Sequence, residues 1–187
     1  SGLVTVSDTT KLWSTGTINL DGGSLTTGSF DNSKAGTFNF HDGTLTVNGA
    51  GGMFDPGTEE FTINGTTATD LPELVIANTA STTLPGNLTV GSTARGKLTV
   101  ETGGVVSNFI GHLGDESGST GEVTVTGAGS QWNNSNSLYV GGNGSGTLNI
   151  EAGGELSNSI GHIGHHPGST GIATVTGAGS QWNNSSW

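Results

Sequence analysis

The sequence predicts an all-β protein folded as a single-stranded parallel β-helix (β-solenoid) of about eight coils, with about 20–25 residues in each coil. The main observation is a duplication, because VTVTGAGSQWNN at residues 123–134 returns as TVTGAGSQWNN at residues 174–184. Trp132 and Trp182 therefore occupy equivalent positions in two copies of one repeat. A fixed period of this size is typical of stacked repeats. The second observation is that short β-branched triplets recur at regular spacing between Gly-rich turns, as expected for short strands joined by corners.

The composition fits a narrow solenoid better than a compact globule. Hydrophobic residues make up only 30% of the chain, and 35 of its 187 residues are Gly, so there are few apolar side chains to fill a broad core. Low hydrophobicity also favours disorder, but only 10% of the residues are charged. Because each coil of a solenoid buries a single layer, a few apolar residues per coil are enough.

The charge balance limits the possible partners. Fifteen acidic and four basic residues give a formal net charge of −11. Nucleic acid is not expected to bind, because phosphate recognition needs a clustered basic surface, and docking on anionic lipid is disfavoured for the same reason. No apolar run approaches the roughly 20 residues of a membrane span, so direct membrane insertion is not expected. The chain has no Cys, and we expect no cofactor.

Residues 1–48 are predicted to form coils of about 20 residues. TINLDGGSL at residues 17–25 aligns with TFNFHDGTL at residues 37–45. In each, the strand is followed by an Asp-Gly corner, where the glycine adopts a positive φ angle at little energetic cost. The alignment stacks three pairs of apolar residues: Ile18 on Phe38, Leu20 on Phe40, and Leu25 on Leu45.

Residues 49–72 are predicted to be an irregular junction between two types of repeat. Met53, Phe54 and Pro56 lie in a Gly-rich bend, and Phe61 to Ile63 form a short strand. Function on a repetitive scaffold usually sits where the repeat is broken. We therefore place the candidate binding residues here, at Met53, Phe54, Glu59 and Glu60.

Residues 73–187 are predicted to form coils of about 24–25 residues, the last of them incomplete. Three columns of stacked apolar residues follow from this spacing. The first two are Leu74, Leu98, Val123, Leu148 and Ala173, and Ile76, Val100, Val125, Ile150 and Val175; the third is Leu88, Leu113, Leu138 and Ile163. The chain stops mid-coil at Trp187, so either further repeats follow or this open coil pairs end to end with a neighbouring copy.

These repeats resemble a known family. Residues 123–158 (VTVTGAGSQWNNSNSLYVGGNGSGTLNIEAGGELSN) and 159–171 (SIGHIGHHPGSTG) resemble the repeat shared by type V secretion (autotransporter) passengers and PEP-CTERM-associated bacterial surface proteins. The coils TINLDGGSLTTGSF and TFNFHDGTLTVNG are also similar to autotransporter passengers, so the resemblance covers nearly the whole chain. It implies a right-handed β-helix that is exported and displayed or released at the bacterial surface.

The resemblance also has limits. The sequence shows no signal sequence, autochaperone segment, outer-membrane barrel or PEP-CTERM tail, so the secretion route rests on the resemblance alone. The repeat carries no assigned active site, and no catalytic residue is transferred from the family.

Two motifs resemble metal sites but are better interpreted as corners of the solenoid. His162, His165 and His166 are clustered, with His112 at the position equivalent to His162, but His165 and His166 align with Asp115 and Glu116. A position that accepts any polar residue argues against a fixed ligand set. GGNGSGTL at residues 141–148 resembles a calcium-binding nonapeptide but lacks its aspartate. We expect no metal site.

Catalysis is not expected either. Asp55, Glu59, Glu60 and Asp70 lie in the junction, and a pair of carboxylates could hydrolyse a glycoside. An enzyme acting on an acidic polysaccharide would also need basic residues to hold the sugar acids, and the chain has only four. A polysaccharide-active enzyme is therefore the third hypothesis.

Trp132 and Trp182 have two readings, internal packing or exposed platforms for sugar stacking, and packing is favoured. The adjoining residues Asn133, Asn134, Asn183 and Asn184 are predicted to form a polar ladder. The triplets at Asn64, Asn87 and Asn143 fit glycosylation, although Asn-rich repeats produce such triplets by chance.

The first functional hypothesis is a non-enzymatic passenger, secreted or displayed at the bacterial surface, that acts as a structural or adhesive scaffold. The alternative is a released virulence factor that acts as the ligand of a host-cell receptor. The expected partner is a host-cell surface protein or glycan, or a neighbouring copy bound end to end.

Overall fold

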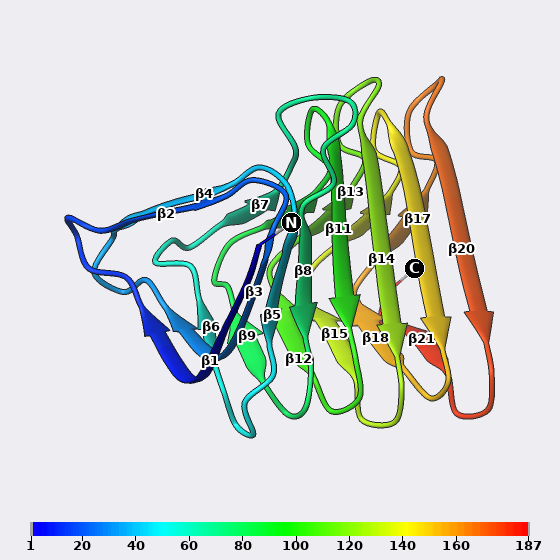
Figure 1. The fold of residues 1–187 in the computed structure, drawn as a ribbon. Coiled ribbons are helices and arrows are strands. Elements are labelled where there is room, and N and C mark those ends of the chain that lie inside the picture. The colour runs from blue at the N-terminus through cyan, green and yellow to red at the C-terminus, as the bar shows by residue number, and fades with distance from the viewer. Residues whose placement is uncertain (1, 187) are drawn as a thin grey trace.

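The computed structural model describes residues 2–186 and shows an all-β solenoid (Figure 1). All pairings between its strands are parallel, and the described residues contain no helix. The predicted right-handed parallel β-helix is confirmed, with about seven turns in place of about eight. Consequently no helix in residues 2–186 is long and apolar enough to cross a membrane.

Three parallel sheets form the walls of the solenoid. The first sheet follows the path β1 (Leu3–Lys11), β3 (Ser24–Asp31), β5 (Thr44–Val47), β8 (Glu73–Ile76), β11 (Arg95–Val100), β14 (Thr120–Thr126), β17 (Ser145–Glu151) and β20 (Thr170–Thr176), with β6 (Phe54–Asp55) beside β3. The second sheet contains β9 (Ser81–Thr83), β12 (Val105–Asn108), β15 (Gln131–Asn134), β18 (Glu155–Asn158) and β21 (Gln181–Asn184). The third contains β7 (Phe61–Ile63), β10 (Leu88–Val90), β13 (Gly111–Leu113), β16 (Leu138–Val140) and β19 (Gly161–Ile163).

The N-terminal turns contribute the two strands of a separate ribbon. β2 (Thr17–Leu20) pairs with β4 (Thr37–Phe40), and Figure 1 shows both projecting to the left of the main stack. The three predicted pairs are confirmed, since Ile18 lies opposite Phe38, Leu20 opposite Phe40 and Leu25 opposite Leu45. The aromatic side chains continue this packing, with the Phe30 ring 4.7 Å from that of Phe38.

The core is a stack of apolar layers. From β8 onward each turn passes through the first, second and third sheets in that order. Leu74, Leu98, Val123 and Leu148 lie in register on the first sheet and are at most 1% exposed. Burial of such a side chain contributes about 1.5–3 kcal/mol. Because each layer rests on the next one, stability accumulates along the axis.

The predicted third column is wrong in every second coil, where the register is displaced along the strand. Leu88 and Leu138 lie opposite Gly111 and Gly161, whereas Leu113 lies opposite Val90 and Val140. Ile163 likewise lies opposite Val140. The reason is that the corners differ in length between alternate coils, so a constant step along the chain does not keep the third sheet in register.

The segment 49–72 contributes strands to two of the sheets. Phe30 and Asp31 of β3 pair with Phe54 and Asp55 of β6, and β7 pairs with β10 of the third sheet. An isolated bridge joins Met53 to Ser81 at the start of the second sheet. The turn containing this segment is the long one, because more of the chain separates Leu45 from its partner Leu74 than separates Leu74 from Leu98 in the next turn. The end-to-end contact expected at Trp187 falls outside the described residues.

Candidate functional site

A groove runs along the outer face of the second sheet. It consists of two adjoining cavities of about 460 Å³ each, which share Thr83 and Pro85 in their walls. The first cavity lies against residues 53–59, and the second extends across successive strands to Phe109 and Ser157. Because it crosses strands of successive turns, this second-sheet groove follows the long axis of the solenoid.

The second-sheet groove has a floor of uncharged polar side chains. Thr83, Ser107, Asn133 and Ser157 are in register on β9, β12, β15 and β18. Alternate residues of a strand point to opposite faces, and the residues between them are buried, so these four face outward. The Ser157 hydroxyl donates a 2.8 Å hydrogen bond to Asn133 Oδ1, which orients the Asn133 amide.

Apolar side chains stand on the rim of the groove. Met53 is 58% exposed at one end, and Phe109 is 43% exposed near the other. The backbone of Phe109 is held on both sides, because its N–H donates to Gly86 and its carbonyl accepts from Asn136 N–H, each at 2.9 Å. The backbone of Phe109 is therefore fixed in place, and its ring is partly exposed.

The residues proposed from the sequence are only partly brought together. Met53, Phe54 and Glu59 line the first cavity. Phe54 is only 1% exposed, and its ring packs 5.6 Å from Phe30 and 5.1 Å from Phe61, so it is mainly a core residue. Glu60 is exposed and does not belong to the described lining of the groove; its charge acts on His112 of the third sheet.

Sequence reasoning missed Thr83, Pro85, Ser107 and Phe109. They lie in regular coils, and nothing in the repeat distinguishes them from other polar or apolar corner residues. Only Phe109 had a signal in the sequence, because the equivalent residue of the second copy is Ser159.

The two tryptophans pack internally. Val106, Trp132, Leu156 and Trp182 are in register on the second sheet, and Trp132 is 0% exposed. The indole N–H of Trp132 donates to Asn108 Oδ1 at 2.7 Å, and Asn108 Nδ2 donates to Asn134 Oδ1 at 2.8 Å. Trp182, Asn158 and Asn184 repeat the arrangement at 2.6 Å for each bond. The predicted polar ladder therefore exists at Asn134 and Asn184, with Asn108 and Asn158 as partners that the sequence did not indicate. Asn133 and Asn183 do not belong to it, because they lie in the outward row with Ser107 and Ser157.

The histidines form an aromatic stack on the outer face of the third sheet. The ring of Tyr139 lies between those of His112 and His162, at centroid distances of 5.1 and 4.6 Å and interplanar angles of 5° and 6°. His165 meets the edge of this stack, 4.7 Å from His162. Within residues 2–186 no group of three or more His, Asp or Glu side chains is arranged to hold a metal ion.

Burial lowers the pKa of both stacked imidazoles. For His112 the loss of hydration is the largest effect, opposed by the charges of Asp115, whose Oδ1 is 3.4 Å from His112 Nδ1, and of Glu60. For His162 the loss of hydration again dominates, and the neighbouring His165 lowers the pKa further. The neutral form of each imidazole is favoured in the folded protein.

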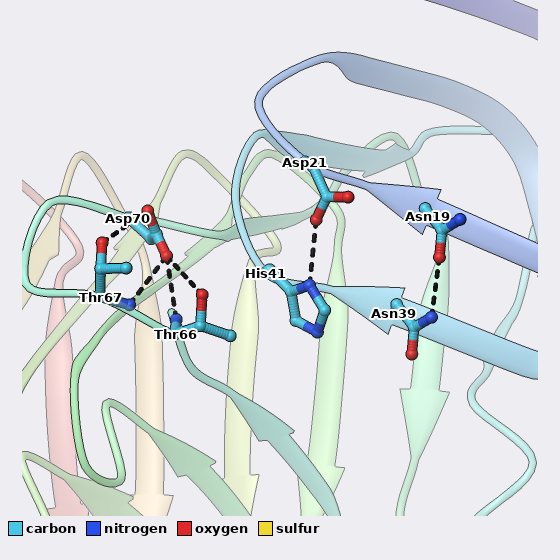
Figure 2. Close-up of polar contacts among 7 residues, drawn as sticks. All are labelled: Asn19, Asp21, Asn39, His41, Thr66, Thr67 and Asp70. Atoms are coloured by element: carbon cyan, nitrogen blue, oxygen red, sulfur yellow. Dashed lines mark hydrogen bonds and ion pairs between the residues drawn. The ribbon is translucent and has the colours of Figure 1, made fainter.

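Asp70 is occupied within its own loop (Figure 2). Its Oδ2 accepts hydrogen bonds from the backbone N–H groups of Thr66 and Thr67, and the hydroxyls of both threonines donate to the carboxylate. These bonds lower the pKa of Asp70 to about 2. Asp31 is similarly held by Lys11 at 2.6 Å, which lowers its pKa. Both carboxylates are therefore structural anions.

The N-terminal ribbon carries a polar edge near this loop. Figure 2 shows Asn39 donating to Asn19 at 2.7 Å and His41 Nδ1 facing Asp21 Oδ1 at 3.0 Å. Asp42 links the ribbon end to the loop, because its Oδ1 accepts the backbone N–H of Leu71 at 2.9 Å. These contacts hold one coil on the next.

The other two motifs are also structural. Of the Gly-rich residues 141–148, residues 141–144 form the corner between β16 and β17 and the rest begin β17. In this corner Gly142 and Asn143 donate backbone N–H groups to Gly114 and Asp115 of the preceding corner. Asn64 accepts three backbone N–H groups from Ser92, Thr93 and Ala94 at 2.9–3.0 Å. Its Nδ2, the atom to which a glycan would be attached, donates to Gly65 O at 2.8 Å and to Thr93 Oγ1 at 3.1 Å, so this amide is already used within the fold.

Comparison of the sequence with protein-family models and with curated proteins, and of the chain with solved structures, gave no match.

Proposed function

We propose that this chain is a non-enzymatic scaffold, secreted or displayed at a bacterial surface, that binds a host-cell surface glycan or protein through the second-sheet groove. The observation that supports this most directly is the groove itself, which has a floor of in-register polar side chains and apolar residues on its rim. The resemblance of the repeats to autotransporter passengers supports export and an adhesive role.

A role without catalysis is part of this proposal. The two carboxylates with shifted pKa values, Asp31 and Asp70, are both shifted downward, whereas a general acid needs a raised pKa. Of the acidic residues in the groove, Asp55 accepts the backbone N–H of Gly57 at 2.8 Å and so shapes its turn. A polysaccharide-active enzyme would have to use Asp55 and Glu59, and it remains the least supported of the three functions.

The second candidate is a released ligand for a host-cell receptor. The observation that favours it is Met53, a flexible apolar side chain that is 58% exposed at one end of the groove. Met is common at surfaces that adapt to protein partners. On this alternative the N-terminal end of the groove would carry the binding energy, and the rest of the solenoid would hold it in place.

Cell binding tests the proposal. The labelled chain of residues 1–187 is applied to cultured host cells and to immobilised extracellular matrix, and we expect saturable binding. Ser107→Arg places a long side chain in the groove and should weaken binding at least tenfold, whereas Thr124→Arg on the outer face of the first sheet should not. Loss of binding in Met53→Ala but not in Ser107→Arg would instead support the second candidate, a ligand for a host-cell receptor. Absence of binding to any cell or matrix would overturn the proposal.

A further inference from the structure

We infer that the second-sheet groove binds a linear, uncharged polysaccharide lying along the solenoid axis. This inference rests on the proposed function, because it names the ligand class of the same groove. The argument uses the chemistry of the floor, the apolar rim, the charge and the shape.

The floor matches the hydrogen-bonding groups of a sugar. Hydroxyl and amide side chains both donate and accept, as sugar hydroxyls do. Thr83, Ser107, Asn133 and Ser157 form one row of such groups, with one residue on each strand. Successive strands of a sheet are about 4.8 Å apart, which is close to the advance of one sugar in an extended β-1,4-linked chain. A linear polymer can therefore place one sugar over each strand. Because successive β-1,4-linked sugars are turned over, the same hydroxyls recur over every second strand.

The rim supplies apolar contacts for the faces of the sugar rings. An aromatic face carries negative charge density and attracts the polarised C–H bonds on one face of a pyranose. Phe109 is 43% exposed and stands beside Asn133 in the second cavity, with Pro85 also exposed there. Met53 provides the corresponding apolar contact in the first cavity.

The charge of the groove selects against acidic polymers. Asp55 and Glu59 line its first cavity, and none of the described residues that line either cavity is Lys or Arg. The whole chain adds a net charge of −11. A uronic acid or sulfated polymer would be repelled both locally and by the field of the protein, whereas an uncharged chain pays no such cost.

The groove does not suit an extended peptide. A peptide strand usually binds by adding to the free edge of a sheet, where unpaired N–H and C=O groups are available. The groove lies on the face of the second sheet, and its inner strands are paired on both sides. Over the second sheet the groove offers side chains, because the backbone groups of the inner strands are already paired. A ligand rich in hydroxyls therefore fits better there than a peptide backbone.

The length of the groove sets the length of the ligand. From the bridge at Met53 to Ser157 the groove crosses five successive strand positions. Four intervals of about 4.8 Å give roughly 19 Å, about the length of four sugars. Affinity should therefore rise from a disaccharide to a tetrasaccharide and change little beyond that length.

Calorimetric titration of the chain tests this inference. The probes are xylohexaose, cellohexaose and chitohexaose, their di- and tetrasaccharides, and a hexamer of galacturonic acid. We expect at least one uncharged hexamer to bind, with the acidic hexamer at least tenfold weaker. Phe109→Ala and Asn133→Ala should each weaken binding at least tenfold, whereas Asn149→Ala, an outward Asn on the first sheet, should leave it unchanged.

The outcomes separate this inference from the proposed function. If the chain binds cells but no uncharged oligosaccharide, or if the acidic hexamer binds as well as the uncharged ones, the inference is wrong and the adhesive function stands. If Asn149→Ala weakens binding as much as Asn133→Ala does, the ligand does not lie in the groove. If neither cells nor oligosaccharides bind, both proposals fall.

Discussion

At the scale of single residues, the fold depends on one contact between large and small side chains. The indole of Trp132 lies against the preceding coil. A Cβ at Gly111 would lie 2.6 Å from Asn134 Oδ1 and 2.8 Å from both Leu138 Cδ1 and Trp132 Cζ2. The same contact recurs between Trp182 and Gly161, at 2.8 Å. Each tryptophan therefore needs a glycine in the coil before it, and its indole N–H needs the buried Asn108 or Asn158.

Gly111→Ala tests this contact. The added methyl group has no space, so we expect destabilisation by about 1–3 kcal/mol. In a Trp132→Leu background, which is itself destabilised by a cavity and by the lost hydrogen bond to Asn108, the same substitution should cost less, by the share of the clash that is due to the indole and not to Asn134 or Leu138. Urea denaturation of the four proteins in this cycle measures the difference. Equal costs in both backgrounds would show that the indole does not set the requirement for glycine.

At the scale of structural elements, the third sheet carries two histidines whose pKa values are lowered in the folded protein. Its outward row runs from Thr89 through His112 and Tyr139 to His162. His112 faces Asp115, Glu60 and Tyr139, and His162 faces Tyr139 and His165. Burial favours the neutral imidazoles in spite of the two carboxylates near His112.

The pH dependence of stability follows from these shifts. A His in the unfolded chain titrates near 6.5, and both folded pKa values lie below that. The stabilisation is fully present above pH 6.5 and is lost as the pH falls from 6.5 to the folded pKa values. We expect the melting temperature to decrease between pH 7 and pH 5, and the decrease to be smaller in the His112→Gln, His162→Gln double variant. An unchanged slope in that variant would assign the pH dependence to other groups.

At the scale of the whole molecule, the unit of construction is a pair of coils. Alternate coils have corners of different length. One coil of each pair supplies the glycine, and the next coil supplies the tryptophan that packs against it. Neighbouring coils therefore cannot be exchanged, although each advances the first sheet by the same step along the chain. The groove on the outer face also belongs to this scale, since its floor is built from strands of four successive turns.

Deletions distinguish a pair of coils from a single coil. Removal of residues 98–147 takes out one pair, and we expect a shorter solenoid that still unfolds cooperatively at moderately reduced stability. Removal of residues 98–122 takes out a single coil and would place Trp132 over Leu88 in place of Gly111, without Asn108 as acceptor. The smaller deletion should be the more destabilising one, as measured by melting temperature. The reverse order would show that coils are interchangeable.

The sequence by itself determined the class of fold and most of the register. Alternating apolar and β-branched residues at a near-constant step were enough to place Leu74, Leu98, Val123 and Leu148 in one column, because the first sheet repeats at that step. The right-handed winding was expected only from the resemblance to autotransporter repeats.

Only the tertiary structure decided the third column and the site. Leu88 and Leu113 fall in different columns because alternate corners differ in length. The sequence does not reveal this difference, because the total number of residues per coil stays nearly constant. The groove could not be read from the sequence, because Thr83, Ser107, Asn133 and Ser157 lie in four separate strands, each a full coil away from the next along the chain. Their outward direction and their alignment are properties of the stacked coils, since the strands come into register only when the chain winds.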